Sequence, residues 1–515
     1  MDIFICSFTT SCVVVALMYG WRILNWVWFK PKNLEKRLRQ QGFDGNSYRF
    51  FNGDLKEISS IAREAELKPM IFSNDIVPRV YPIFHKASQK FGEKCFVWFG
   101  PKPALIVLDP ELIRDVLSKN YIFQKPPGSP LASLLGRGLV MLEADEWAKH
   151  RKLINPAFHV QKLKHMVASF YMSCGNMLSK WDEIVGSDGS VEVDVWPYLQ
   201  AMTSDVISRA AFGSSYDEGG KIYQLQKEQA DRILDANRSL HIPGWRFLPT
   251  KVNRRMKEIR KEIESIFLNI ISRRMKEVEA GEASREDLLG ILLESNLKEI
   301  KQHGTKFGMG MKEVIEECKI FFFAGQDTSA SLLVWTMILL SKHKDWQVRA
   351  RDEVLQVFGR GKPDYQELSH LKIVSMVLYE VLRLYPPIVM LARVTERESG
   401  SGKVTIPAGV QLMLPVLLLH HDPKIWGDDV KEFNPGRFSE GVSKATQGKL
   451  TYLPFGWGPR VCIAQNFALL QSKMALATIL QHYSFELSPS YCHAPRTVIS
   501  LQPQHGADLI LTKLH

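Results

Sequence analysis

Residues 455–464 read FGWGPRVCIA, and the single cysteine of this stretch governs how the rest of the chain is interpreted. Cys462 follows a turn of two glycines and a proline, and the next segment, NFALLQSKMALATIL, has the apolar spacing of a buried helix. Three interpretations compete for this cysteine: a zinc ligand, a catalytic nucleophile, or a buried core residue. The absence of another Cys or His within ten residues argues against zinc, whereas the sequence leaves a nucleophile open.

The residues around Cys462 favour a fourth interpretation, a thiolate that binds a large flat cofactor. Gly456, Gly458 and Pro459 would let the backbone turn tightly beside a ring, and backbone N–H groups after the cysteine could donate to its sulfur. Arg460 supplies a cation for an anionic group at the rim of the cofactor. A helix that starts near Ile463 would direct its positive end toward the thiolate.

This stretch resembles the Phe-x-x-Gly-x-Arg-x-Cys-x-(Gly/Ala) loop of the cytochromes P450, the haem-thiolate monooxygenases. The resemblance implies the mainly helical, triangular fold of that family, with small β-sheets and an N-terminal transmembrane helix. It also implies a haem b cofactor whose iron is bound axially by Cys462, with Phe455 and Arg460 among the haem-binding residues.

Further arginines stand where the family binds the two haem propionates. Trp147 and Arg151 occur in EWAKHRK, and Arg393 follows ten residues after Arg383. Each of them alone would be better explained as a solvated surface residue. Together with Arg460, and by the resemblance, Trp147, Arg151 and Arg393 are expected to bind the haem carboxylates.

Glu380 and Arg383 lie three residues apart in YEVLRLYPP, a spacing that places an ion pair on one helical face. Such a pair is usually a surface salt bridge. In this order it resembles the Glu-x-x-Arg pair of the family, which joins an arginine from a later loop to form a structural network. That arginine would be Arg437 in FNPGRF, although Gly436 replaces the usual acidic residue before it.

The stretch FFFAGQDTSASLLVW (321–335) places polar residues inside an apolar helix pattern. One explanation is a glycine kink whose hydroxyl groups bond back to helix carbonyls. The order of residues also resembles the oxygen-activating site of the family. In that reading Ala324 and Gly325 leave space for oxygen and part of the substrate pocket, and Asp327 and Thr328 are the catalytic pair that relays protons from water.

The best local resemblance is to the plant clan that contains secologanin synthase and triterpenoid oxidases, in stretches such as NPAFHVQKLK and LPFGWGPRVCIAQNFALLQSKMALA. Members of that clan act on terpenoids. By analogy of position, substrate contacts are expected from Ile388, Val389, Met390 and Leu391. These side chains are apolar and agree with a lipophilic substrate.

No charged residue occurs between Ile3 and Trp21, a length close to the roughly 20 residues that span a bilayer. The basic residues follow this segment, which predicts an uncleaved anchor with its C-terminal side in the cytosol rather than a signal peptide. The sequence therefore predicts an anchor over 1–29, a basic linker over 30–50 and one haem-thiolate domain over 51–515.

The net charge of +11 is spread along the chain, and no basic block points to nucleic acid. The charge suits anionic lipid or an acidic partner, and seven scattered cysteines indicate a reducing compartment. No dinucleotide fingerprint is present, so the resemblance implies that NADPH acts only through NADPH–cytochrome P450 reductase at the endoplasmic reticulum membrane. The alternatives are a haem-thiolate isomerase or dehydratase that acts on peroxides, and a non-catalytic membrane haem-binding protein.

Overall fold

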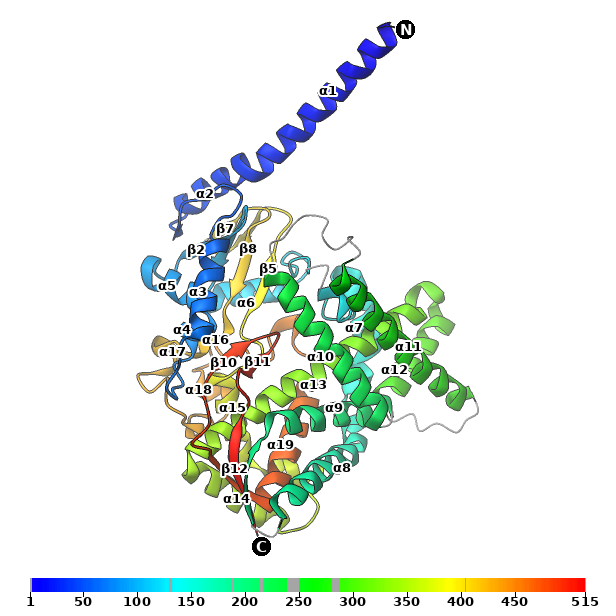
Figure 1. Cartoon of the computed structure of the whole chain (residues 1–515), viewed down its shortest axis with the longest axis vertical. Coiled ribbons are helices and arrows are strands. Elements are labelled where there is room, and N and C mark those ends of the chain that lie inside the picture. Colours follow the sequence, from blue (N-terminus) through cyan, green and yellow to red (C-terminus); the bar gives the residue numbers. More distant parts are fainter. Residues whose placement is uncertain are drawn as a thin grey trace. The chain divides into compact units, whose positions relative to one another are not determined.

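The computed structural model describes residues 2–128, 132–186, 189–213, 216–238, 250–279, 287–402 and 404–514. In these residues the chain is mainly helical with four small sheets, as the sequence predicted (Figure 1). Its contacts group into two compact units. Unit 1 comprises Met1–Lys68, Val77–Pro126 and Met390–Leu418, and unit 2 comprises Pro69–Ile76, Pro127–Val389 and Leu419–His515.

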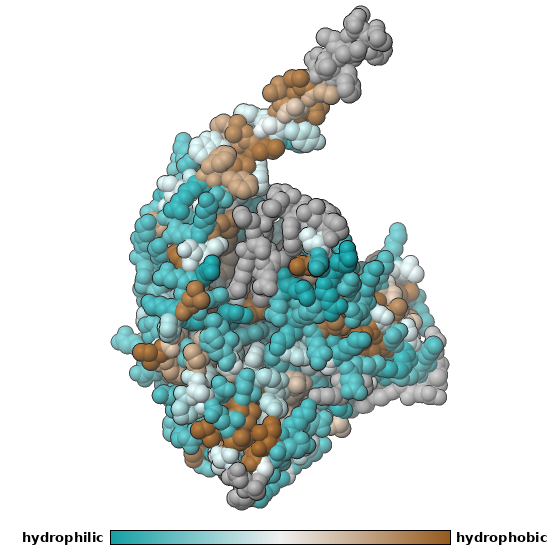
Figure 2. All heavy atoms as spheres, in the orientation of Figure 1, coloured by the Kyte–Doolittle hydropathy of each residue, from teal (hydrophilic) through white to brown (hydrophobic). Residues whose placement is uncertain are grey.

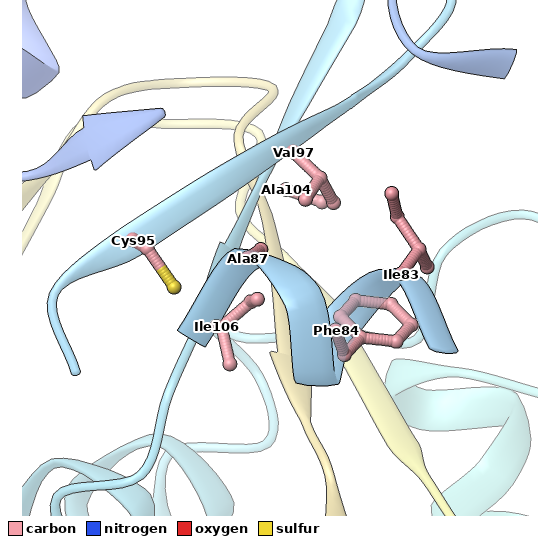
Figure 3. Packing of buried hydrophobic residues seen from close by; sticks show 7 residues of the cluster. All are labelled: Ile83, Phe84, Ala87, Cys95, Val97, Ala104 and Ile106. Atoms are coloured by element: carbon pink, nitrogen blue, oxygen red, sulfur yellow. The ribbon is translucent and has the colours of Figure 1, made fainter. Parts of the chain in front are cut away.

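Unit 1 is built around a five-stranded sheet with the strand order β1-β2-β3-β8-β5. The strands are β1 (Asp44–Gly45), β2 (Cys95–Phe99), β3 (Lys102–Ile106), β8 (Gln411–Leu414) and β5 (Leu391–Val394). Helix α5 (Pro82–Phe91) packs against this sheet, and the two elements share a buried apolar cluster (Figure 3). The remaining elements of unit 1 are α3 (Leu55–Leu67), α4 (Val77–Val80), α6 (Pro110–Ser118) and the hairpin of β6 (Ser399–Ser401) and β7 (Val404–Ile406).

The N-terminal part of unit 1 is one continuous run of helix. Helix α1 (Asp2–Leu24) passes through the π-helical turn η1 (Asn25–Phe29) into α2 (Lys30–Gln40). Within the described residues, one helix, Ser11–Gln40, is long and apolar enough to cross a membrane. The segment 30–50 contains α2 and β1, and the apolar face of α2 buries Leu34 and Leu38.

Unit 2 is centred on α13 (Met311–Lys342), whose second half is almost wholly buried. It packs against α9 (Trp196–Phe212), α15 (Lys372–Leu384) and α19 (Gln465–His482), and α8 (Val160–Val185) packs on α9 and α19. The other helices are α7 (Ala144–Ile154), α10 (Tyr216–Arg238), α11 (Lys251–Glu279), α12 (Leu288–His303), α14 (Lys344–Phe358), α17 (Pro423–Trp426) and α18 (Val442–Ala445). Helix α16 (Val416–His420) contains the point where the chain passes from unit 1 to unit 2.

Two small sheets complete unit 2. One has the order β4-β12-β9 and consists of β4 (Ser190–Asp194), β12 (Asp508–Lys513) and β9 (Tyr483–Leu487), all antiparallel. The other pairs β10 (Pro495–Thr497) with β11 (Leu501–Pro503). The hydroxyl group of Ser331 and the indole N–H of Trp335, both on α13, donate to the carbonyl oxygen of Leu501 at 2.6 and 2.9 Å. These bonds fix β11 along the central helix.

Candidate active site

The loop before α19 holds Cys462 in a closely defined position. The Cys462 N–H donates to the carbonyl oxygen of Phe455 at 2.9 Å, which closes the turn. Gly456 and Gly458 have φ values of 72° and 75°, a region that L-residues with side chains rarely adopt. The sequence needs glycine at these two positions because the turn requires a left-handed backbone.

Burial and the neighbouring polar groups have opposite effects on the pKa of the Cys462 thiol. Burial raises the pKa of its thiol, whereas the backbone N–H of Ala464 and the charge of Arg151 lower this pKa. The side chain is nevertheless accessible to a water-sized molecule, so it borders an internal space. The predicted N–H donor to the sulfur is present, and α19 begins at Gln465, two residues after the predicted start.

Two of the predicted cofactor-binding arginines converge on the Cys462 loop. From α7, Arg151 Nη1 donates to the carbonyl oxygen of Val461 at 2.9 Å. The Arg460 guanidinium lies 4.3 Å from the ring centroid of Trp147, and its Nη2 is 2.6 Å from a carboxylate oxygen of Glu143. Helix α7 therefore brings Trp147 and Arg151 together with Arg460, as predicted for residues that share one ligand.

Arg393, the remaining predicted cofactor-binding residue, belongs to unit 1. It lies on β5, is 4% exposed, and donates through Nη1 to the carbonyl oxygen of Ala392 at 2.8 Å. Its role toward the cofactor stays a prediction.

The predicted ion-pair network is present, and Glu380 and Arg383 within it are fully buried. Arg383 Nε and Nη2 donate to the two carboxylate oxygens of Glu380 at 2.8 and 2.7 Å. Arg437 Nε lies 3.7 Å from Glu380, but Arg437 makes its shorter contacts with Asp429, at 2.7 and 3.1 Å. Asp429, seven residues before Gly436, thus supplies a carboxylate partner for Arg437.

His420 links this network to the Cys462 loop, and the sequence did not single it out. The backbone N–H of Leu453 donates to His420 Nε2 at 2.9 Å, so the proton lies on Nδ1, which donates to the carbonyl oxygen of Arg383 at 3.2 Å. Burial lowers the pKa of His420 to about 3 and that of His421 to about 4, which keeps both rings neutral. The paired histidines after an apolar run are the signal that could have drawn attention to them.

The two residues of the predicted proton relay bind different partners. The Thr328 hydroxyl donates to the carbonyl oxygen of Ala324 at 2.7 Å, the back-bonding that the sequence left open as an alternative. Asp327 is 6% exposed and accepts hydrogen bonds from Ser500 and from Gln502 Nε2, the latter at 2.9 Å. Burial raises the pKa of Asp327 to about 6, against the lowering effect of these hydrogen bonds.

Between residues 321 and 341 of α13, only 323–325 and 328 are accessible to solvent. Ala324 and Thr328, one turn apart, are partly accessible, whereas Gln326, Asp327 and the residues from 329 to 341 are buried. The two therefore share a face that borders space. Gly325 has a packing role as well, since a Cβ atom there would lie 2.9 Å from Ile207 Cδ1 on α9.

A cavity of about 50 Å³ adjoins the buried side of Asp327. Its polar lining includes Gln326 of α13 and Gln502 of β11, together with Lys227 of α10, whose charge acts on Asp327. A polar space of this size can hold water molecules. Asp327 is thus a carboxyl group with a raised pKa, about 6, beside a site for water.

A second buried carboxylate on α13, Glu317, was missed by the sequence analysis. Its Oε1 lies 2.5 Å from His150 Nδ1 on α7, and its Oε2 accepts the backbone N–H of Leu139 at 2.9 Å. The neighbouring Glu316 accepts the N–H of Arg137 at 2.7 Å. These bonds attach α7 and the segment 137–139 to the first half of α13. The acidic pair inside an apolar helix pattern was the available signal.

The four residues predicted to contact substrate fall on both sides of the unit boundary. Ile388 and Val389 belong to unit 2, where Ile388 is partly accessible and Val389 is 3% exposed. Met390 and Leu391 belong to unit 1, and Met390 packs against the α5 cluster. A shared pocket for the four residues stays a prediction.

The family model for cytochrome P450 matches residues 76–507. The chain belongs to the cytochrome P450 family. It is similar to cytochrome P450 CYP72A219 of Panax ginseng, with 59% identity over 98% of this chain and 97% of the relative. Secologanin synthase 1 of Catharanthus roseus is 51% identical over 100% and 99% of the two chains. The retinoic acid-bound cyanobacterial CYP120A1 shares the fold, with a TM-score of 0.73, 23% identity and coverage of 86% of this chain and 96% of that one.

This cytochrome P450 is a monooxygenase that uses haem, with electrons supplied indirectly by a reductase. Its residues fit the group: an accessible cysteine with an N–H donor to its sulfur, and a cluster of Arg151, Arg460 and Trp147 beside it. Cys462 would bind the iron and the arginines the carboxylates. When bound, haem activates molecular oxygen for insertion into a substrate.

Proposed function

We propose that this cytochrome P450 hydroxylates or further oxidises a plant terpenoid, such as an iridoid, a triterpenoid or a terpenoid hormone. The observation that carries the proposal is the identity of 51% to secologanin synthase along the whole of both chains. Two of the residues predicted to contact substrate, Ile388 and Ala324, are apolar and partly accessible, which agrees with a lipophilic substrate.

In this proposal the site residues have different roles in holding the haem. Cys462 is the axial ligand, and Phe455 closes its loop through the Cys462 N–H. Trp147 orients the Arg460 guanidinium from its ring face, and Arg460, Arg151 and Arg393 are proposed to bind the haem carboxylates. Glu380, Arg383 and Arg437 form the structural network described above.

Proton supply is assigned to Asp327 and Thr328. Asp327 takes protons from water in the adjoining cavity, because a carboxyl group that titrates near the working pH exchanges protons efficiently in both directions. Thr328 lies on the partly accessible face of α13, so its hydroxyl can turn from Ala324 toward a ligand. Ala324 and Gly325 keep that face free of bulk.

Membrane attachment is assigned to residues 1–29. The uncharged segment Ile3–Trp21 is followed by Arg22, Lys30, Lys32 and further cations. Positive charge on this flank keeps the following domain on the cytosolic side. We assign the protein to the endoplasmic reticulum membrane as a single-pass protein. Its partner there is NADPH–cytochrome P450 reductase, and no role with nucleic acid is proposed.

The test is turnover of a terpenoid panel by microsomes that contain this chain and a plant reductase, with products identified by mass spectrometry. We expect a product that carries added oxygen and that requires NADPH and the reductase. Cys462→Ser is the control, and it should lose both the product and the carbon-monoxide difference band of thiolate-bound haem. A product that forms without NADPH would instead show an isomerase or dehydratase.

A further inference from the structure

We propose that Gln502 of β11 is a positioning residue for proton supply, because its side-chain amide holds the Asp327 carboxyl group beside the polar cavity whether that group is ionised or protonated. The inference rests on the proposed role of Asp327 in proton supply and deepens it. It gives the β10–β11 hairpin a part in catalysis beyond its packing on α13.

Three side chains on one face of α13 contact the hairpin. Asp327, Ser331 and Trp335 are spaced by four residues, so they lie along a single stripe of the helix. Ser331 and Trp335 both donate to the carbonyl oxygen of Leu501, and the Leu501 N–H donates to the carbonyl oxygen of Pro387 at 3.0 Å. These bonds fix the strand without Asp327. The remaining contact of the stripe, made by Asp327, is therefore not needed to attach the hairpin and calls for another role.

Neighbouring residues of the hairpin donate hydrogen bonds to the Asp327 carboxylate. Gln502 Nε2 donates to Asp327 Oδ1 at 2.9 Å, and Ser500, which is fully buried, donates to the same carboxylate. Gln502 Nε2 also lies 3.4 Å from Ser500 Oγ. The titratable groups of α10 that line the cavity are Tyr223, Lys227 and Asp231. Because the strand fixes both donors, it also fixes the orientation of the carboxyl group.

An amide is suited to hold a carboxyl group that gains and loses a proton. An ionised carboxylate only accepts hydrogen bonds, whereas a protonated carboxyl group also donates through its O–H. The Gln502 side chain has an NH₂ group that donates and a carbonyl oxygen that accepts, and the Ser500 hydroxyl can do both as well. A lysine at position 502 would only donate and would favour the ionised form of Asp327. Gln502 therefore keeps Asp327 in one orientation before and after proton transfer.

The cavity beside Asp327 contains further buried polar atoms. Gln326 Nε2 and Gln200 Oε1 belong to its lining, and both side chains are 4% exposed. Neither atom has a hydrogen-bond partner among the residues that the structure describes. Buried polar atoms of this kind normally bind ordered water. Water in the cavity therefore lies beside the carboxyl group that Gln502 holds, which is the arrangement that proton uptake by Asp327 needs.

The first measurement needs no substrate. It uses the full-length holoenzyme in nanodiscs, because Figure 2 shows apolar surface along the described part of the N-terminal helix. Infrared spectra over a pH series follow the C=O stretch of protonated carboxyl groups in protein that is isotope-labelled at its aspartate carboxyl carbons. The band that Asp327→Asn removes is that of Asp327. The carbon-monoxide difference band shows that each variant has bound haem.

Gln502→Met keeps the length of the side chain but removes a donor to the ionised form of Asp327. We expect it to raise the pH midpoint of the Asp327 band by about one pH unit. Gln502→Glu should raise the midpoint further, because it places a second carboxyl group beside the first. The control is Gln504→Met, since Gln504 is also partly accessible but lies outside the residues that line the cavity. An unchanged midpoint in both Gln502 variants would overturn the inference.

The second measurement connects this midpoint to catalysis. With a substrate from the terpenoid panel and a plant reductase, Gln502→Met should reduce the product formed per NADPH oxidised by about half, and its pH profile should move with the infrared midpoint. In an Asp327→Asn background, Gln502→Met should change the ratio no further, because its effect passes through Asp327.

The outcomes separate the inference from the proposed function. A shifted midpoint with an unchanged ratio of product to NADPH would refute both the inference and the proposed role of Asp327 in proton supply. A panel that gives no product would refute the proposed substrate class, whereas an unmoved midpoint refutes the inference alone.

Discussion

Removal of the Glu317 carboxylate should destabilise the protein far more than removal of the Glu299 carboxylate, which pairs with the exposed Lys152 of the same helix, α7. Glu317 is fully buried, and its two oxygens each have a partner: His150 Nδ1 at 2.5 Å and the Leu139 N–H at 2.9 Å. Glu317→Ala leaves both partners without an acceptor. Each buried group left unpaired costs about 1–3 kcal/mol, so we expect a loss of about 3–5 kcal/mol in the free energy of unfolding.

Two further variants separate the hydrogen bonds from other effects. Glu317→Gln keeps the volume and one acceptor oxygen, and we expect a loss of about 1–2 kcal/mol. Glu299→Ala is the control, because Glu299 also holds α7, through a contact of 2.6 Å with Lys152, whose side chain is 65% exposed. A surface pair of this kind is worth about 0–1 kcal/mol.

The measurement is pulse proteolysis of the full-length holoenzyme in a urea series, which gives the midpoint of unfolding for each variant. Hydrogen exchange at the Leu139 amide provides a local measurement, and it should accelerate in Glu317→Ala more than in Glu299→Ala. If Glu317→Ala and Glu299→Ala had the same midpoint and the same exchange rate at Leu139, the buried acceptor would not hold this segment, and our reasoning would be refuted.

Three further predictions concern catalysis, pH and docking. Thr328→Ala should retain the carbon-monoxide difference band but form less product per NADPH oxidised, because the hydroxyl that now bonds Ala324 is lost; an unchanged ratio would exclude Thr328 from proton supply. The lowered pKa values of His420 and His421, about 3 and about 4, mean that stability is lost as pH falls below the unfolded value of 6.5. We expect about 2 kcal/mol lost per histidine at pH 5, and melting curves that coincide at pH 8 and pH 5 would contradict this. Reductase-supported turnover should fall with added salt while a peroxide-supported reaction changes little, since the net charge of +11 favours an acidic partner; a parallel fall in both would exclude electrostatic docking.

Local motifs could be interpreted from the sequence because their partners lie within a few residues of one another. The Cys462 loop closes onto Phe455 seven residues earlier, and Glu380 binds Arg383 one helical turn later. Glycine at 456 and 458 and the three-residue spacing of the ion pair encode these geometries directly. The apolar spacing of NFALLQSKMALATIL likewise predicted a buried helix, and the structure has α19 (Gln465–His482) there.

Tertiary packing decides where some helices begin, which the local sequence does not show. A 3₁₀ turn at Glu367–His370 precedes α15. Glu353 of α14 accepts the backbone N–H groups of residues 372–374 at 2.7–3.0 Å, which fixes a new helix start there. A side chain from a preceding helix therefore decided this boundary.

By itself, the sequence determined the fold class, the tight turn before Cys462, and the polar residues within the central helix, since each depends on spacing along the chain. The tertiary structure alone decided which groups surround them. His420 meets Leu453, Asp327 meets Gln502, and Glu317 meets both His150 and Leu139, across separations of 33 to 178 residues. A buried polar group must find a partner wherever the fold provides one, and no periodicity along the chain records which partner that will be.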